Sequence, residues 1–377
     1  MNSARWCLLG TVAACGGSAR QRPVSVTPGI AVEDPAGTGT LELGRWHERR
    51  GTSPDAGPTA SANLAWRTAA PGSVLDAVGT DGDTLWVSVE GRVLSLTRDG
   101  SVAWDEDVRA VGAVTATDEG PAVATADGVV LVLEPQDGKT RKAYPAGGTL
   151  AGPPTTLGGE LAWVNQNGTV VGASGWVVEA ATSAAGGAVS TGDMLFFTTR
   201  EGELVATNPS GVQWRSPMPG GGIGHPVTNG TIVLSAYGVR TGGSGGVIAF
   251  SAEDGAEVWR WATGFEPAAP PAWGSAVFVA DMGGVLRALD PLTGEEIWHT
   301  EGETAFSATP TVTPLSVYAV EVTGRVSRLD PDDGGQVWVI DLASAATASP
   351  AVMGDLLVVG LANGSVVAIG PDRGSYE

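Results

Sequence analysis

The chain has 377 residues, among them 56 glycines and 13 tryptophans, and its 41 acidic and 21 basic side chains give a formal net charge of −20. A surface this acidic repels phosphates and anionic lipid headgroups, which excludes nucleic acid as a partner and excludes purely electrostatic binding to a membrane. Both cysteines, Cys7 and Cys15, lie in the first fifteen residues, so the folded part has no disulfide, no thiolate metal site and no cysteine nucleophile.

Residues 1–14 are predicted to be a lipoprotein signal peptide. One positive charge, Arg5, precedes an apolar run over residues 6–14 that is too short to span a bilayer. The order Val12-Ala13-Ala14-Cys15 resembles the bacterial lipobox, which implies that Cys15 becomes the first mature residue and carries diacylglycerol and palmitate. An ordinary secretory signal cut nearby is the alternative. Several acyl chains attach a protein stably to a membrane. Glycine directly after the cysteine, at Gly16, resembles the signal that sorts lipoproteins to the outer membrane.

Residues 15–62 are predicted to form the lipidated cysteine and a disordered tether. From residue 16 on they are rich in Gly, Ala, Ser, Thr and Pro and have no periodic apolar pattern. A flexible chain of this length spans about 35–40 Å root-mean-square. The basic and aromatic segment Arg45-Trp46-His47-Glu48-Arg49-Arg50 interrupts the tether. It is interpreted as solvated tether, with a docking peptide or a strap against the rim of the folded part as the alternatives.

From residue 63 on, a hairpin turn that ends in glycine recurs about every forty residues between apolar runs. Asn-Gly and Asp-Gly at such turns favour the type I′ hairpin, whose twist matches that of paired strands. Self-similarity at this period indicates a repeat fold. The eight turns predict an all-β, eight-bladed β-propeller over residues 63–377. The turn glycines are Gly91, Gly128, Gly168, Gly202, Gly246, Gly284, Gly324 and Gly364.

A second turn follows seven to ten residues after the first in seven of the eight units, and a tryptophan often follows that turn. Each blade is therefore predicted to have four antiparallel strands. The eighth unit ends soon after Asp372 without its tryptophan-bearing outer strand, and the segment from Asn63 to Arg67 resembles that missing strand. We expect the N-terminal strand near Trp66 to close the ring, which removes the seam between the two chain ends.

Three units depart from the pattern. Lys142 stands near the tryptophan position of the second unit, and Trp176 of the third unit follows its turn directly, out of register. The fifth unit has an insertion at residues 238–246, which predicts a longer hairpin.

One tryptophan per blade on the outermost strand is interpreted as a structural post that docks blades together, because regular repetition favours packing over ligand binding. A ligand platform is the alternative. The docking residues are Trp66, Trp104, Trp214, Trp259, Trp298 and Trp338.

The sixth unit reads Ala288-Leu289-Asp290-Pro291-Leu292-Thr293-Gly294-Glu295-Glu296-Ile297-Trp298. This segment resembles the Ala-x-Asp-x-x-Thr-Gly-x-x-x-Trp docking motif of the pyrroloquinoline-quinone (PQQ) repeat family, and units five and seven match it in part. One branch of that family contains quinoprotein dehydrogenases, which bind PQQ and a metal. The other branch contains non-catalytic propellers such as the BamB-like lipoproteins of outer-membrane assembly. The compact blades, the lipobox and the tether resemble those of the second branch. This resemblance implies that the protein binds no cofactor.

Residues for catalysis or metal binding do not stand out. His47, His225 and His299 are scattered without ligand or triad spacing, and the Ser244 elbow-like pattern has no helix after it. Residues 330–334 lack the spacing of a calcium loop. We therefore predict no catalytic, cofactor-binding or metal site.

These features predict a non-catalytic scaffold, anchored by lipid to the bacterial outer membrane and facing the periplasm. The expected partners are envelope proteins, either subunits of a barrel-assembly machine or unfolded outer-membrane proteins, with the propeller a monomer inside a larger complex. The lipid anchor is the expected contact with the membrane. The alternatives are a PQQ-binding enzyme or sensor and a subunit of a lineage-specific secretion or surface complex.

Overall fold

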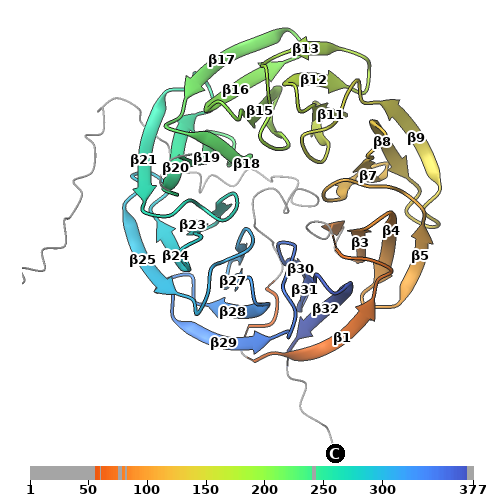
Figure 1. Ribbon diagram of the computed structural model, residues 1–377, viewed down its shortest axis with the longest axis vertical. Helices are drawn as coiled ribbons and strands as arrows, with labels where there is room; N and C mark the ends of the chain where they lie inside the picture. The colour runs from red at the N-terminus through yellow and green to blue at the C-terminus, as the bar shows by residue number, and fades with distance from the viewer. Residues whose placement is uncertain (1–55, 60, 75–78, 81–82, 240–242, 372–377) are drawn as a thin grey trace, which may run out of the picture.

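The computed structural model describes residues 56–59, 61–74, 79–80, 83–239 and 243–371, and these form an eight-bladed β-propeller (Figure 1). Eight four-stranded antiparallel sheets surround a central axis, and in all but one of them the chain runs from the strand nearest the axis to the strand at the rim. The fold class predicted from the repeats is confirmed. Within these ranges, no helix is long and apolar enough to cross a membrane.

The strands follow one another blade by blade around the ring. Blades one to three are β2 (Gly79–Thr80), β3 (Thr84–Val89), β4 (Arg92–Thr97) and β5 (Val102–Glu106); β6 (Thr115–Thr117), β7 (Gly120–Ala124), β8 (Val129–Leu133) and β9 (Thr140–Pro145); and β10 (Thr155–Leu157), β11 (Glu160–Val164), β12 (Thr169–Gly172) and β13 (Val177–Glu179). Blades four and five are β14 (Val189–Thr191), β15 (Met194–Thr198), β16 (Glu203–Asn208) and β17 (Gly211–Pro217); and β18 (Gly221–Thr228), β19 (Ile232–Gly238), β20 (Gly245–Ser251) and β21 (Glu257–Thr263).

The last three blades complete the ring. Blades six and seven are β22 (Ala272–Trp273), β23 (Val277–Ala280), β24 (Val285–Leu289) and β25 (Glu296–Glu301); and β26 (Thr311–Thr313), β27 (Ser316–Val320), β28 (Arg325–Leu329) and β29 (Gln336–Asp341). Blade eight is β30 (Ala351–Met353), β31 (Leu356–Gly360), β32 (Ser365–Gly370) and β1 (Asn63–Ala69).

The hydrophobic core lies between neighbouring blades, and this explains the nearly continuous apolar strands. All four residues of β23 are buried, because both faces of a middle strand are covered by adjacent sheets. Phe278 and Leu286 of blade six, for example, belong to one cluster with Val317 and Leu329 of blade seven. Each blade therefore depends on its two neighbours for burial, as in other repeat proteins.

Ring closure occurs in blade eight, where β1 pairs antiparallel with β32 and places Trp66 opposite Ala368 (Figure 1). The first strand of the described chain thus lies beside its last one, and the prediction that the segment near Trp66 closes the ring is confirmed. Closure leaves only the short outer strands as open sheet edges.

Seven of the eight predicted turn glycines have positive φ, between 74° at Gly128 and 97° at Gly202. The prediction of a turn at Gly246 is wrong. Gly246 lies inside β20, opposite Tyr237 of β19 and Ala262 of β21. The insertion in this unit extends both strands of the hairpin, so the chain reverses farther out, beside Gly243, whose φ is +64°.

The predicted docking tryptophans lie at the joints between blades, and their indoles donate hydrogen bonds to a carbonyl in the next blade. Trp298 Nε1 lies 2.9 Å from the carbonyl oxygen of Pro331, which precedes β29 in the turn of blade seven. Four further indoles make the equivalent bond, at 2.8–3.3 Å: Trp66 to Arg98, Trp104 to Pro135, Trp214 to Ala252 and Trp259 to Pro291.

A glycine in the accepting turn makes each joint possible. The ring of Trp298 lies against Gly334, where φ is +72° and an added Cβ would stand 2.5 Å from the indole. The same relation holds between Trp259 and Gly294. Glycine is needed there because L side chains rarely adopt positive φ and because the indole fills the space of a side chain. The second turn of one unit is therefore the docking site for the tryptophan of the preceding unit.

Two blades lack this joint. Lys142 occupies the tryptophan position of blade two, opposite Val132, and pairs with Glu119 at 2.7 Å. In its place, Trp163 of blade three is buried and donates back to the carbonyl oxygen of Ala146, at 3.0 Å.

Trp176 of blade three follows a tight turn, as expected, and folds over its own blade. The amide of Gly172 donates to the carbonyl of Trp176, and the indole donates to Glu160 Oε1 at 2.6 Å. A Cβ at Gly172 would collide with this indole. Glycine at that position therefore lets the ring lie on its own sheet.

Truncating a docking tryptophan is predicted to destabilise the ring. Trp298→Ala removes the bond to Pro331 and the contact with the Phe278 ring, whose centroid is 5.8 Å away. Because Trp298 is only half-buried, we expect a loss near the low end for such truncations, about 3 kcal/mol of unfolding free energy in urea. The neighbouring Ile297→Ala, with 53% of the side chain exposed, should cost less than about 0.5 kcal/mol. Equal losses in the two variants would contradict the docking role.

Candidate functional site at the closing seam

Blade eight differs from the other seven because its third and fourth strands are not joined by a turn. Strand β32 ends at Gly370, whereas β1 begins at Asn63, so the two strands come from opposite ends of the chain. Blade eight therefore has no turn of its own that could offer a carbonyl to Trp338, the docking tryptophan of blade seven.

Residues 56–59, here called the strap, supply that carbonyl. Trp338 Nε1 lies 3.0 Å from the carbonyl oxygen of Pro58, which corresponds to the prolines at three of the other joints. The amide of Gly57 donates to the carbonyl oxygen of Gly354 at 3.0 Å. The strap belongs to the segment expected to be free tether, so contacts with the propeller begin before the boundary at residue 63.

The hydroxyl group of Tyr318 binds the strap. The Tyr318 hydroxyl lies 3.0 Å from the carbonyl oxygen of Ala56 and 3.3 Å from that of Pro58, and its side chain is fully buried. Burial raises the pKa of this phenol above its ordinary value. Gly57 has a φ of +61°, and a Cβ there would collide with the Tyr318 hydroxyl. The strap thus fits one conformation closely.

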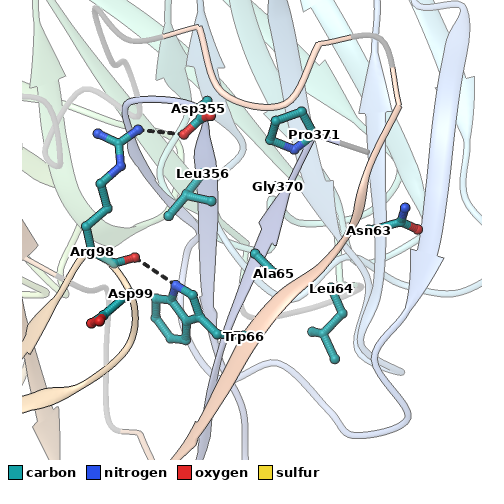
Figure 2. Close-up of a pocket in the computed structure, with 10 residues that line it drawn as sticks. All are labelled: Asn63, Leu64, Ala65, Trp66, Arg98, Asp99, Asp355, Leu356, Gly370 and Pro371. Carbon is teal, nitrogen blue, oxygen red and sulfur yellow. Dashed lines mark hydrogen bonds and ion pairs between the residues drawn. The ribbon is translucent and has the colours of Figure 1, made fainter. Parts of the chain in front are cut away.

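A pocket of about 550 Å³ opens between blade eight and blade one (Figure 2). We call it the seam pocket. Its lining includes Leu64 and Trp66 of β1 and Leu356 and Pro371 of blade eight, with the Leu64 side chain on the other side of β1 from Trp66. Leu64 is 51% exposed although it is a large apolar side chain.

Charged groups gather along one side of the seam pocket. Arg98 Nη2 lies 2.5 Å from Asp355 Oδ1, and the carbonyl of Arg98 accepts the Trp66 indole at 2.9 Å (Figure 2). Asp99 also lines the pocket, and a hydrogen bond from the Thr97 hydroxyl, supported by the Ser101 amide, lowers the pKa of its carboxyl. Two carboxylates and one guanidinium give this side a net negative charge.

The described residues contain no group of three or more His, Cys, Asp or Glu side chains that could hold a metal ion. The two buried carboxylates there already have partners. Asp281 pairs with Arg287 at 2.5 Å, and Glu321 accepts the amide and the hydroxyl of Thr304 at 2.7 and 2.8 Å. Because both carboxylates bind groups of the protein itself, they do not fit the oxygen ligand set that Ca²⁺ requires.

Hydroxyl groups near the axis fasten successive blades to one another. Thr309 donates to the carbonyl of Pro270 at 3.0 Å, Thr311 to that of Pro350 at 2.6 Å and Thr347 to that of Val74 at 2.8 Å. The innermost segments are therefore held by bonds between blades.

Four of the sequence-based expectations concern residues outside the described ranges and remain predictions. They are the signal peptide at residues 1–14, the lipidation of Cys15, the tether as far as residue 55 and the Arg45–Arg50 segment. Sequence reasoning missed the strap and Tyr318. Pro58 could have been found, because a proline carbonyl meets the tryptophan at other joints, but it stands among the many prolines and glycines of the tether.

Comparison with protein families gives one match over more than half of the chain. The family model described as outer membrane protein assembly factor BamB matches residues 157–272 and 243–376. A protein of that description from Nitrosomonas eutropha is 33% identical over 137 residues, which are 34% of this chain and 32% of that protein. The match thus spans about a third of that relative's length.

Solved structures with the same fold are much more distant in sequence. BamB from Moraxella catarrhalis superimposes with a TM-score of 0.66 at 15% identity, over 84% of this chain and 100% of that one. The computationally designed protein Ika8 gives 0.68 at 13% identity, over 80% and 98%. Quinohemoprotein alcohol dehydrogenase from Comamonas testosteroni gives 0.66 at 12% identity, over 86% and 80%. At these identities the matches show the fold alone.

Disturbing the strap is predicted to weaken the closed ring. Gly57→Val places a β-branched side chain at positive φ and against the Tyr318 hydroxyl, so we expect a loss of about 2 kcal/mol in chemical denaturation. The control is Gly264→Val, at a glycine with open space around it, where the change should stay below about 0.5 kcal/mol. A Gly57→Val protein as stable as the control would show that the strap is not part of the fold.

Alkaline pH is predicted to loosen the strap through Tyr318. Because burial raises the pKa of its hydroxyl in the folded state, the neutral phenol is favoured by folding. Its contribution is fully present below the unfolded value of about 10 and is lost as the pH rises through the folded pKa. Unfolding free energy measured from pH 8 upward should therefore fall more steeply above about pH 10 in the wild type than in Tyr318→Phe. Identical slopes in the wild type and in Tyr318→Phe would refute this assignment.

Proposed function

This chain belongs to the PQQ-repeat family of outer membrane protein assembly factor BamB, and we propose that it is a non-catalytic scaffold that binds other proteins in the bacterial cell envelope. The observation that carries the proposal is the family match, which extends over residues 157–376. The distant structural likeness supports the fold on which this function would rest.

The rim of the propeller has surfaces suited to protein partners. The outer strands carry open edges, to which an extended segment can add by main-chain hydrogen bonds. Apolar residues stand exposed on these strands one position before the docking tryptophan, as at Ile297 (53%) and Val337 (42%). Ile297 lies in a bulge, between the pairs Leu289–Glu296 and Ala288–Trp298, which turns its side chain outward. Exposed apolar groups of this kind favour a binding surface.

The proposed place of action is the outer membrane, on its periplasmic side. Lipidation of Cys15 would anchor the chain there, and the tether would let the propeller reach partners near the membrane surface. The proposed partners are subunits of a barrel-assembly machine or unfolded outer-membrane proteins, and the name of the Nitrosomonas relative supports this class.

A tagged full chain, recovered from its host in mild detergent, should retain barrel-assembly subunits. Replacing both rim residues, Ile297→Glu and Val337→Glu, places charge on the proposed edge and should reduce recovery by about tenfold or more. Leu315→Glu, at an equally exposed site in a turn, serves as the matched control. Recovery of only secretion or surface-complex proteins would favour the lineage-specific alternative, and recovery of no envelope protein would count against the scaffold.

The second candidate function is a PQQ-binding enzyme or sensor. The observation that favours it is the fold that this chain shares with quinohemoprotein alcohol dehydrogenase. PQQ with calcium would supply redox chemistry to such an enzyme. The partners already bound to Asp281 and Glu321 argue against a calcium site at those two carboxylates. We expect PQQ and Ca²⁺ together to leave the visible spectrum of the quinone and the melting temperature unchanged. A clear shift in either one would reverse this ranking.

A further inference from the structure

The second turn of blade three has the same backbone form as the second turn of blade one. In blade one, the amide of Gly100 donates to the carbonyl of Thr97, three residues before it, at 2.9 Å. In blade three, the amide of Gly175 donates to the carbonyl of Gly172, again three residues before it, at 2.8 Å. Both turn glycines have positive φ, 84° and 96°. The two turns can therefore accept the same kind of side chain.

The two turns differ in what covers them. Gly100 is buried, and an added Cβ there would stand 2.6 Å from the indole of Trp66, which docks from blade eight. Gly175 is exposed, and an added Cβ there would meet no atom of the described residues within 4 Å beyond its chain neighbours. The turn of blade three thus has the form of an indole docking site, but no indole of the described residues lies over its glycine.

The preceding blade explains why this turn is uncovered. Lys142 of β9 stands at the docking position, opposite Val132, but its ammonium group donates to Glu119 of its own blade at 2.7 Å. Val132 packs in one cluster with Trp163 of blade three, so this face of the sheet is directed at blade three. Trp163 is buried on the second strand of its blade, and the turn at the rim stays open.

The rim beside this turn can receive an extended peptide. Strand β9 is the outer strand of blade two (Figure 1), and five of its six residues are exposed. Its free edge can add a further strand through main-chain hydrogen bonds. Directly opposite residues on paired strands have their side chains on the same face. A residue opposite Lys142 on an added strand would therefore point toward blade three, as Trp298 points toward blade seven.

We propose that the second turn of blade three, residues 172–175, docks a tryptophan side chain from an extended segment of a partner protein. The indole lies on Gly175 and donates to the carbonyl of Ala173, which corresponds to that of Arg98 in blade one. Tryptophan fits because its ring covers the glycine while its N–H reaches a carbonyl. The partner thereby supplies the joint that blades two and three lack. This site rests on the proposed scaffold function, because its occupant belongs to another protein.

Filling the site from within the chain tests whether the turn accepts an indole. Lys142→Trp should raise the melting temperature of the full chain by about 2 °C or more, because it supplies the missing joint. Gly175→Ala, which places a Cβ where the ring would lie, should abolish that gain. The matched control is Arg141→Trp, at the unpaired bulge position of the same strand, which should leave the melting temperature unchanged. No gain from Lys142→Trp, or an equal gain from the control, would overturn the proposal.

A defined peptide tests binding of a separate segment. Acetyl-Thr-Val-Trp-Val-Thr-amide, added to the full chain with isotope-labelled glycine, should shift the NMR signal of the Gly175 amide with a Kd of about 1 mM or below. That signal is identified by its loss in Gly175→Ala. The peptide with alanine in place of tryptophan should give a shift about fivefold smaller or less, and Lys142→Trp, which fills the site, should abolish binding.

The result that would overturn the proposal is no shift at Gly175, an equal shift with the alanine peptide, or undiminished binding to Lys142→Trp. No envelope protein takes part in this assay, so such a result would leave the scaffold function standing. Failure to recover barrel-assembly subunits in detergent would, in turn, leave the peptide result unchanged.

Discussion

The hydrogen bond from a rim indole to a carbonyl of the next blade is the interaction on which the closed ring depends. One such bond contributes about 1 kcal/mol, but it also brings the indole against a turn glycine and seals the apolar cluster between two sheets, as at Trp298 and Gly334. In a repeat protein each unit is stabilised mainly by its neighbours. The stability of a ring built in this way therefore depends on the joint at which the two ends of the repeat array are closed.

The joint between blades seven and eight is completed by residues that precede the first strand of the described chain. Pro58 offers its carbonyl to Trp338, and Tyr318 holds the strap, while β1 completes the sheet of blade eight. Two segments from the N-terminal side thus close the ring. In a lipid-anchored scaffold, this arrangement would attach the tether directly to the fold at the closing joint.

Much of the fold could be predicted because its local requirements are strict. A turn that needs positive φ takes glycine, as at Gly91 and Gly324, so the blade count can be read from the sequence. Gly246 misled because the insertion of blade five is itself glycine-rich and several glycines satisfy the pattern. The seam pocket could not be predicted. It depends on residues far apart in sequence, Trp66 and Leu356, which come together only when the ring has closed.

The strap could not be predicted from the sequence for a related reason. Its key group is a backbone carbonyl, which every residue possesses, so composition gives no signal for it. Hydrogen exchange of the tryptophan indole protons, followed by NMR on the full chain, tests its role most directly. We expect the Trp338 indole proton to exchange as slowly as that of Trp298, because the two indoles donate to the carbonyls of Pro58 and Pro331 at 2.9–3.0 Å. Exchange of the Trp338 proton at the rate of a free indole, with Trp298 protected, would contradict closure by the strap.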